Sequence, residues 1–139
     1  MNDVPWVAAL LAGGAAQSIK LLLAVSRARG ITLRMLLNLP GMPSTWAALC
    51  GALVTAVAKQ DGFASAAAAM TATLSCLVLY DALKLRRSAG RQAQLLNLVA
   101  RDLELHRPEA AGRHLRELLG ETPAQVVGGL VIGVLVALP

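Results

Sequence analysis

The residues of this chain best suited to chemistry stand at two helix starts. Ser44 and Thr45 follow Pro43, an arrangement typical of the beginning of a helix. Thr122 precedes Pro123 in the run Thr-Pro-Ala-Gln, a capping box with proline at the first helical position. A helix start presents free backbone N–H groups and the positive end of the helix dipole, and both attract anions. The first start is therefore a candidate for binding a phosphate group, and the second has a structural role beside it.

Three basic side chains could complete such an anion site. Arg86 and Arg87 are adjacent, and a guanidinium group can hold phosphate through two parallel hydrogen bonds. Lys20 lies near the end of the first apolar segment, where its long side chain can reach the membrane surface. For Asp81 we favour a structural ion pair with one of these three cations over a role as catalytic acid. The alternative for the whole group is that the cations only set membrane orientation and the caps only begin helices.

The elements that must position these residues have the pattern of membrane-spanning helices. The chain has 139 residues, of which 56% are hydrophobic and only 15% are charged, and the apolar residues are gathered into blocks. These blocks cover residues 4–25, 45–58, 63–83 and 123–138, and a bilayer requires about 20 residues of helix. We predict an all-α, multi-pass membrane helical bundle of about four spans, forming one domain over residues 1–139. The alternative is an unusually hydrophobic soluble helical bundle.

The distribution of charge predicts how this bundle is oriented. The net charge is +5; the loop after the first span carries three arginines and no acid, and region 84–121 carries eight basic residues against five acids. Since basic residues favour cytoplasmic loops, both loops and both helix starts should face the cytoplasm, with both termini outside. This pattern explains the charge without a nucleic acid. We expect the lipid bilayer as the partner, in the plasma membrane of a bacterium.

Region 84–121 is polar but retains helical periodicity. Apolar residues recur at helical spacing over 88–106, and Pro108 can open a second short helix that runs to residue 119. We expect cytoplasmic amphipathic helices that lie on the bilayer or cap the bundle. In the last span, Gly129 and Gly133 permit close helix packing, a pattern compatible with a homo-oligomer. Cys50 and Cys76 fall inside apolar segments, so neither a metal nor a cofactor is predicted.

Three motifs resemble the divergent PAP2 family of membrane proteins, which is related to acid phosphatases and vanadium-dependent haloperoxidases. Residues 41–48, GMPSTWAA, are similar to that family's Gly-Met-Pro-Ser-Ser-His-Ser-Ala. Residues 81–97 contain Asp-Ala, Arg-Arg-Ser-Ala-Gly-Arg-Gln-Ala and Leu-Asn, like the family's Asp-Ala, Arg-Arg-x-x-Gly-x-Gln-Ala and Leu-Asn. Residues 118–126, LLGETPAQV, resemble Leu-Gly-His-Thr-Pro-x-Glu-Val, and Gln17 with Lys20 fits the polar pair of the first helix. The order and spacing of these motifs extend over nearly the whole chain.

Three departures from the family pattern matter for the mechanism. Trp46 and Glu121 stand where the motifs have histidine, and Gln125 stands where they have glutamate. In the broader PAP2 superfamily one histidine attacks the phosphate ester and a second protonates the leaving group. The resemblance therefore implies that this chain has lost the catalyst. Glu121 could act as a base, but its negative charge would repel a phosphate.

The predicted function is that of a catalytically degenerate, phosphatase-like membrane protein that binds phosphate or a lipid phosphate on its cytoplasmic face. Lys20, Ser44, Thr45, Arg86 and Arg87 would make the contacts. Two alternatives stay open. One is an active membrane phosphatase with an altered catalytic set, and the other is a non-catalytic structural or accessory subunit.

Overall fold

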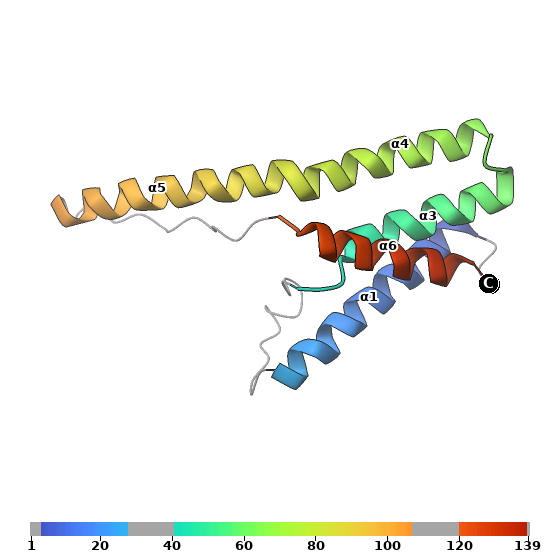
Figure 1. The fold of residues 1–139 in the computed structure, drawn as a ribbon, viewed down its shortest axis with the longest axis horizontal. Coiled ribbons are helices and arrows are strands. Elements are labelled where there is room, and N and C mark those ends of the chain that lie inside the picture. The colour runs from blue at the N-terminus through green and yellow to red at the C-terminus, as the bar shows by residue number, and fades with distance from the viewer. Residues whose placement is uncertain (1–3, 28–40, 107–119, 139) are drawn as a thin grey trace. The chain divides into compact units, whose positions relative to one another are not determined.

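The structure is a computed structural model that describes residues 4–27, 41–106 and 120–138. Its elements in chain order are α1 (Pro5–Arg27), α3 (Thr45–Asp61), α4 (Ala66–Tyr80), the π-helical turn η1 (Asp81–Leu85), α5 (Arg86–His106) and α6 (Pro123–Ala137) (Figure 1). The described residues are helical with short connections and no strand, so the predicted all-α class is confirmed. The predicted second amphipathic helix, 108–119, and the arginines at 29 and 34 lie outside the described residues.

The chain divides into two compact units. The first contains α1, α3, α4 up to Leu79, and α6 from its Thr122 cap, and the second runs from Tyr80 to Glu121. The candidate residues are therefore divided between two units, each of which has its own internal geometry. Whether residues 1–139 behave as one domain stays a prediction.

The interior of the first unit is built from small residues. Its buried cluster consists of alanines, which recur at every fourth position on α1 and on α3, namely Ala8, Ala12, Ala16, Ala48, Ala52 and Ala56, with Ala137 from α6. Large apolar side chains point outward instead; Leu22 is 69% exposed and Leu135 is 61% exposed. A soluble bundle buries its large apolar side chains in the core. Small residues inside and large ones outside are typical of helices packed in lipid, which argues against the soluble alternative.

Helices α3 and α6 lie side by side and run in the same direction (Figure 1). A Cβ atom at Gly129 would overlap the carbonyl oxygen of Ser44, and one at Gly133 would overlap that of Ala48. At the far end, the Lys59 ammonium donates to the carbonyl oxygens of Ala137, at 3.1 Å, and Leu138, at 2.7 Å. The two glycines thus have no space for a side chain, and the pair of helices is joined near both ends.

Helix α1 runs antiparallel to α3. The Thr45 hydroxyl at the start of α3 donates to the Gln17 side-chain oxygen at 2.9 Å. One turn further along each helix, a Cβ atom on Gly13 would lie 3.0 Å from the Leu49 side chain. The start of α1 therefore lies at the same end of the unit as the ends of α3 and α6. This arrangement agrees with the alternating directions expected for membrane spans.

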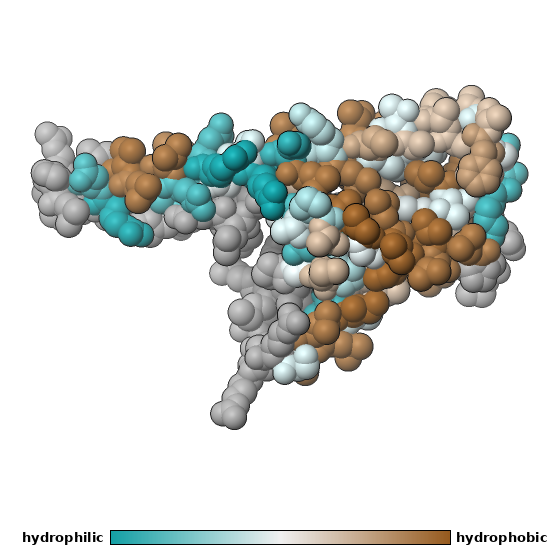
Figure 2. All heavy atoms as spheres, in the orientation of Figure 1, coloured by the Kyte–Doolittle hydropathy of each residue, from teal (hydrophilic) through white to brown (hydrophobic). Residues whose placement is uncertain are grey.

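Among the described residues, two helices are long and apolar enough to cross a membrane. These are Pro5–Ser26 and the continuous helical stretch Ala66–Asp102, while α6 is apolar but shorter. Figure 2 shows hydrophobic residues over much of the visible surface of α4 and α6. The predicted span 63–83 does not end as a helix at residue 83, because the backbone continues through η1 into α5. No residue between Lys84 and Ala89 is a strong helix breaker, so the change from apolar to charged sequence does not interrupt the helix.

Candidate functional site

The start of α3 is fixed by Ser44. Its hydroxyl oxygen accepts a hydrogen bond from the backbone N–H of Ala47 at 3.0 Å, as expected for a residue that caps a helix. Ser44 is fully buried, so the structure gives it a capping and packing role. Its direct contact with a phosphate stays a prediction. Thr45, the first residue of the helix, is half-buried and donates to Gln17.

The start of α6 is the capping box that the sequence predicts. The Thr122 hydroxyl accepts from the Gln125 N–H at 3.3 Å, and the Gln125 side-chain oxygen accepts from the Thr122 N–H at 2.7 Å. Pro123 occupies the first turn, where its missing N–H costs no hydrogen bond. Glutamine and glutamate both serve at this position of a capping box. Gln125 can therefore fill the structural role that glutamate would have in the motif.

The two helix starts meet. The backbone N–H of Ser44 donates to the carbonyl oxygen of Gln125 at 2.9 Å, which joins the residue capping α3 to the first turn of α6. The absence of a side chain at Gly129 allows this approach. The expectation that both helices begin on one side of the bundle therefore agrees with the geometry of the first unit.

Lys20 borders a cavity next to these helix starts. The cavity has a volume of about 570 Å³ and is lined from α1, from the residues that precede α3 and from α6. Apart from Lys20, the described residues that line it are uncharged: Ile19, Leu23, Ala24, Gly41, Met42, Pro43, Gly128 and Ile132. A single cation on an otherwise apolar wall suits a ligand that has both an anionic group and a hydrocarbon part.

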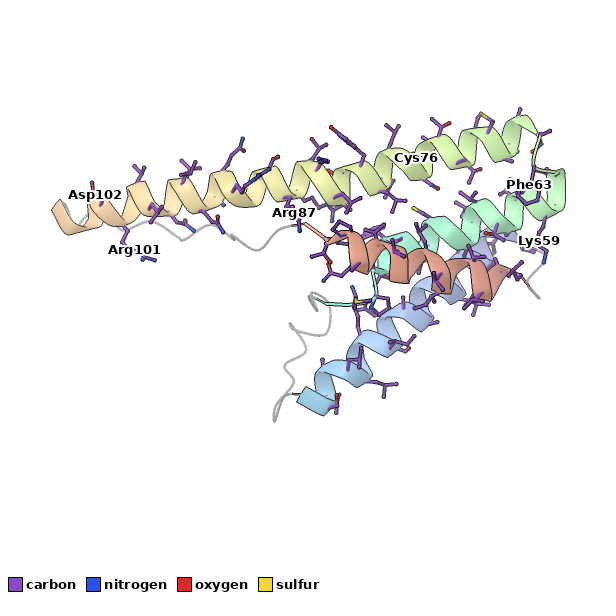
Figure 3. The ribbon with its side chains drawn as sticks, in the orientation of Figure 1. Lys59, Phe63, Cys76, Arg87, Arg101 and Asp102 are labelled. Carbon is purple, nitrogen blue, oxygen red and sulfur yellow. The ribbon has the colours of Figure 1, made fainter. Side chains whose placement is uncertain are left out.

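The second unit holds the two arginines. Arg86 donates through Nε to Asp81 Oδ2 at 2.8 Å, so of the three partners expected for Asp81 the structure shows Arg86. This ion pair is partly exposed on both sides and contributes little to stability. Arg87 is exposed at the start of α5, where Figure 3 labels it. Because Asp81 offsets the charge of Arg86, Arg87 is the stronger candidate for an anion contact.

The remaining motif positions have distinct environments. Trp46 is 49% exposed in the first turn of α3. Glu121 is half-buried in the second unit, and its backbone N–H donates to the carbonyl oxygen of Ala82 at 3.0 Å. Within the described residues, no group of three His, Cys, Asp or Glu side chains is placed to hold a metal ion.

Two features of the structure have no clear signal in the sequence. One is the π-helical turn η1, whose residues Asp-Ala-Leu-Lys-Leu carry no recognisable signal for it. The other is the contact of Lys59 with the end of α6, which joins residues nearly eighty positions apart in the sequence. Only a lysine in the last turn of a predicted span could have suggested an interaction with carbonyl groups at a helix end.

The interior of alanine and glycine, the outward apolar side chains and the helices of membrane-spanning length define an α-helical membrane protein. The divergent PAP2 family matches residues 1–136, and the chain belongs to that family. It is also similar to an uncharacterized membrane protein of Bacillus subtilis, YuiD. The two are 30% identical over 148 aligned positions, which cover 99% of this chain and 94% of the relative. No solved structure matches the chain.

Proposed function

We propose that the protein binds a phosphorylated lipid on the cytoplasmic side of the membrane and hydrolyses it poorly or not at all. The observation that carries the proposal is the cavity beside the joined helix starts, in which Lys20 is the one charged residue among the described residues of the lining. An ammonium group suits a phosphate monoester. The apolar residues around it suit the hydrocarbon part of a lipid better than they suit free phosphate.

The other contacts of the proposal come from both units. In the first unit, the Thr45 hydroxyl lies at the start of α3, in the turn where free N–H groups favour an anion. In the second unit, Arg87 and, more weakly, Arg86 stay predicted anion contacts, because each carries a guanidinium group. Ser44 supports the site by capping α3.

Loss of catalysis follows from the side chains at the motif positions. An indole at Trp46 and a carboxylate at Glu121 cannot replace the two histidines that the family resemblance implies. The rival proposal is an active phosphatase that uses other residues, and a third is a subunit that binds no phosphate. The three proposals predict different results for phosphate binding and for phosphate release, so both measurements on the same samples can distinguish them.

The test uses the purified full-length chain in lipid nanodiscs of phosphatidylcholine with increasing fractions of phosphatidate. With Trp6→Phe in the background, Trp46 is the remaining tryptophan and reports on the start of α3. We expect a saturable fluorescence change with phosphatidate. Phosphatidylglycerol, which is anionic but a diester, controls for membrane charge alone. Inorganic phosphate and vanadate show whether the phosphate group suffices without the lipid.

Lys20→Ala should weaken phosphatidate binding by about 10- to 100-fold, because a hydrogen bond to a charged group is worth about 1.5–3 kcal/mol. Lys59→Ala is the matched control, since Lys59 lies at the opposite end of α3 (Figure 3) and should leave affinity unchanged. Equal affinity of Lys20→Ala and the parent protein would contradict the proposal.

Phosphate release measured in the same samples separates the alternatives. Release that Arg87→Ala abolishes would favour the active phosphatase. If neither fluorescence nor thermal stability changes with phosphatidate, inorganic phosphate or vanadate, the protein is better described as a structural or accessory subunit.

A further inference from the structure

The second unit contains a π-helical turn, η1, that accepts a hydrogen bond from outside the helix. In η1, the N–H of Arg86 donates to the carbonyl oxygen of Asp81, five residues earlier. A regular α-helix would direct that N–H to the carbonyl oxygen of Ala82 instead. The Ala82 oxygen accepts the N–H of Glu121 at 3.0 Å. The π-helical turn therefore directs the Arg86 N–H away from the Ala82 carbonyl group, and the Glu121 N–H donates to that group.

Residues 120–121, here called the strap, lie against this turn, and Gly120 makes the closest approach. Its φ of +94° is one that side-chain-bearing residues rarely adopt. A Cβ atom at Gly120 would lie 2.9 Å from the backbone nitrogen of Arg87 and 3.1 Å from its Cα. Glycine is therefore required both by the backbone conformation and by the close approach to Arg87.

We infer that the strap is the positioning element for Arg86 and Arg87, and that it acts by holding the π-helical turn. Without the Glu121 N–H, the buried Ala82 carbonyl group would lack its donor in the π-helical turn, which favours the α-helical geometry in which Arg86 donates to it. Since each residue of an α-helix advances by about 100°, every side chain after the turn would rotate about the helix axis by about that angle. The strap therefore decides which way the two arginines face. The inference extends the proposed function, because it states how the arginines of that site are oriented.

The experiment measures the rotation of α5 directly, by labelling of single cysteines with a water-soluble maleimide. In a background with Cys50→Ala and Cys76→Ala, one reporter is Ala93→Cys, at a buried position, and the other is Gln94→Cys, at an exposed position about 100° away. We expect Gly120→Ala to accelerate labelling at position 93 at least tenfold and to slow it at position 94. Gly62→Ala is the matched control, because Gly62 has a similar φ of +90° with no atom near its absent side chain.

Deletion of Lys84 provides a second variant that keeps the test decisive if Gly120→Ala alone folds poorly. Removing one residue from a π-helical turn leaves an α-helix in which the following residues keep their original orientation. The deletion should therefore restore slow labelling at position 93 in the presence of Gly120→Ala. Lys84→Ala, which removes the charge without shortening the turn, should not.

Unchanged labelling in Gly120→Ala would overturn the inference, as would a similar response to Gly62→Ala. Phosphatidate binding is measured on the same variants, and we expect Gly120→Ala to weaken it and the Lys84 deletion to recover it. If the parent protein does not bind phosphatidate, the proposed function fails. The labelling pattern still decides whether the strap sets the orientation of α5.

Discussion

At the scale of single residues, the glycines of this chain are not equivalent. Gly129 faces the Ser44 carbonyl oxygen across the α3–α6 contact, whereas Gly14 on α1 is exposed and has nothing within 4 Å of the position of a Cβ atom. The first is glycine because the neighbouring backbone occupies the space. The second has no steric reason to lack a side chain.

Substitution by alanine should therefore have opposite effects at these two positions. We expect Gly129→Ala to destabilise the protein by about 1–3 kcal/mol or more, because the added methyl group forces the helices apart. Gly14→Ala should be neutral or stabilising by up to about 1 kcal/mol, since alanine favours the helix. Thermal unfolding in detergent measures both. A Gly129→Ala protein as stable as the parent would mean that the α3–α6 contact is looser than described.

The residues of the candidate site were predictable to different degrees. The capping roles of Ser44, Thr122 and Pro123 follow from local chain chemistry, which sequence displays directly. The bond between Thr45 and Gln17 depends on the packing of α1 against α3, so the sequence indicated only that both residues are polar. That Lys20 borders a cavity is likewise a result of packing among three separate parts of the chain.

At the scale of elements, the capping box of α6 is the simplest local interaction to test. Thr122→Ala removes the side-chain oxygen that accepts from the Gln125 N–H, and it should destabilise the protein by about 1 kcal/mol. Thr122→Ser retains that oxygen and serves as the control. Chemical unfolding in detergent gives the free energies. Equal losses for both variants would show that the methyl group of Thr122, and not its hydroxyl, stabilises this helix start.

The predicted span 63–83 shows that the presence of a membrane helix is easier to predict from sequence than the residue at which the helix ends. The change from apolar to charged sequence marks where the surroundings of a helix change from lipid to water. Charged residues are compatible with a helix, so this change does not end it. The helix ran on because its residues are compatible with helix on both sides of that change. The π-helical turn in between depends on the contact with Glu121, from about forty residues away, and so had no local signal.

At the scale of the whole molecule, the orientation in the membrane is open to direct measurement. In the cysteine-free background, Asp61→Cys reports on the connection between α3 and α4, and Gln92→Cys reports on α5; both positions are exposed. We expect an impermeant maleimide added to intact bacterial cells to label position 61 but not position 92, which should react only after the membrane is permeabilised. The reverse pattern would place both termini in the cytoplasm and move the candidate site to the outer face.

The class of the molecule, an α-helical membrane protein, could be predicted from sequence. Long hydrophobic blocks with charged residues at their borders are typical of helices that pass from lipid into water. The identity of the buried residues was less accessible. In a soluble protein the most hydrophobic residues indicate the core, whereas here the core residues are alanines and glycines, which also occur in many other places. The predicted close packing through Gly129 and Gly133 occurs within the chain, between α3 and α6, so these glycines give no support to a homo-oligomer.

The two attachments between α3 and α6 have a mechanical consequence. Ser44 is bonded to Gln125 near one end and Lys59 to Ala137 and Leu138 at the other, while Gly129 and Gly133 fit against backbone in between. Sliding either helix along the other would break both attachments and disturb the close contact of Gly129 and Gly133 with the backbone of α3. The pair should thus move as a single rod. Any widening of the adjoining cavity, as would be needed to admit or release a lipid, must then come from α1, which is bonded to that rod through Gln17 and Thr45, or from the residues that precede α3.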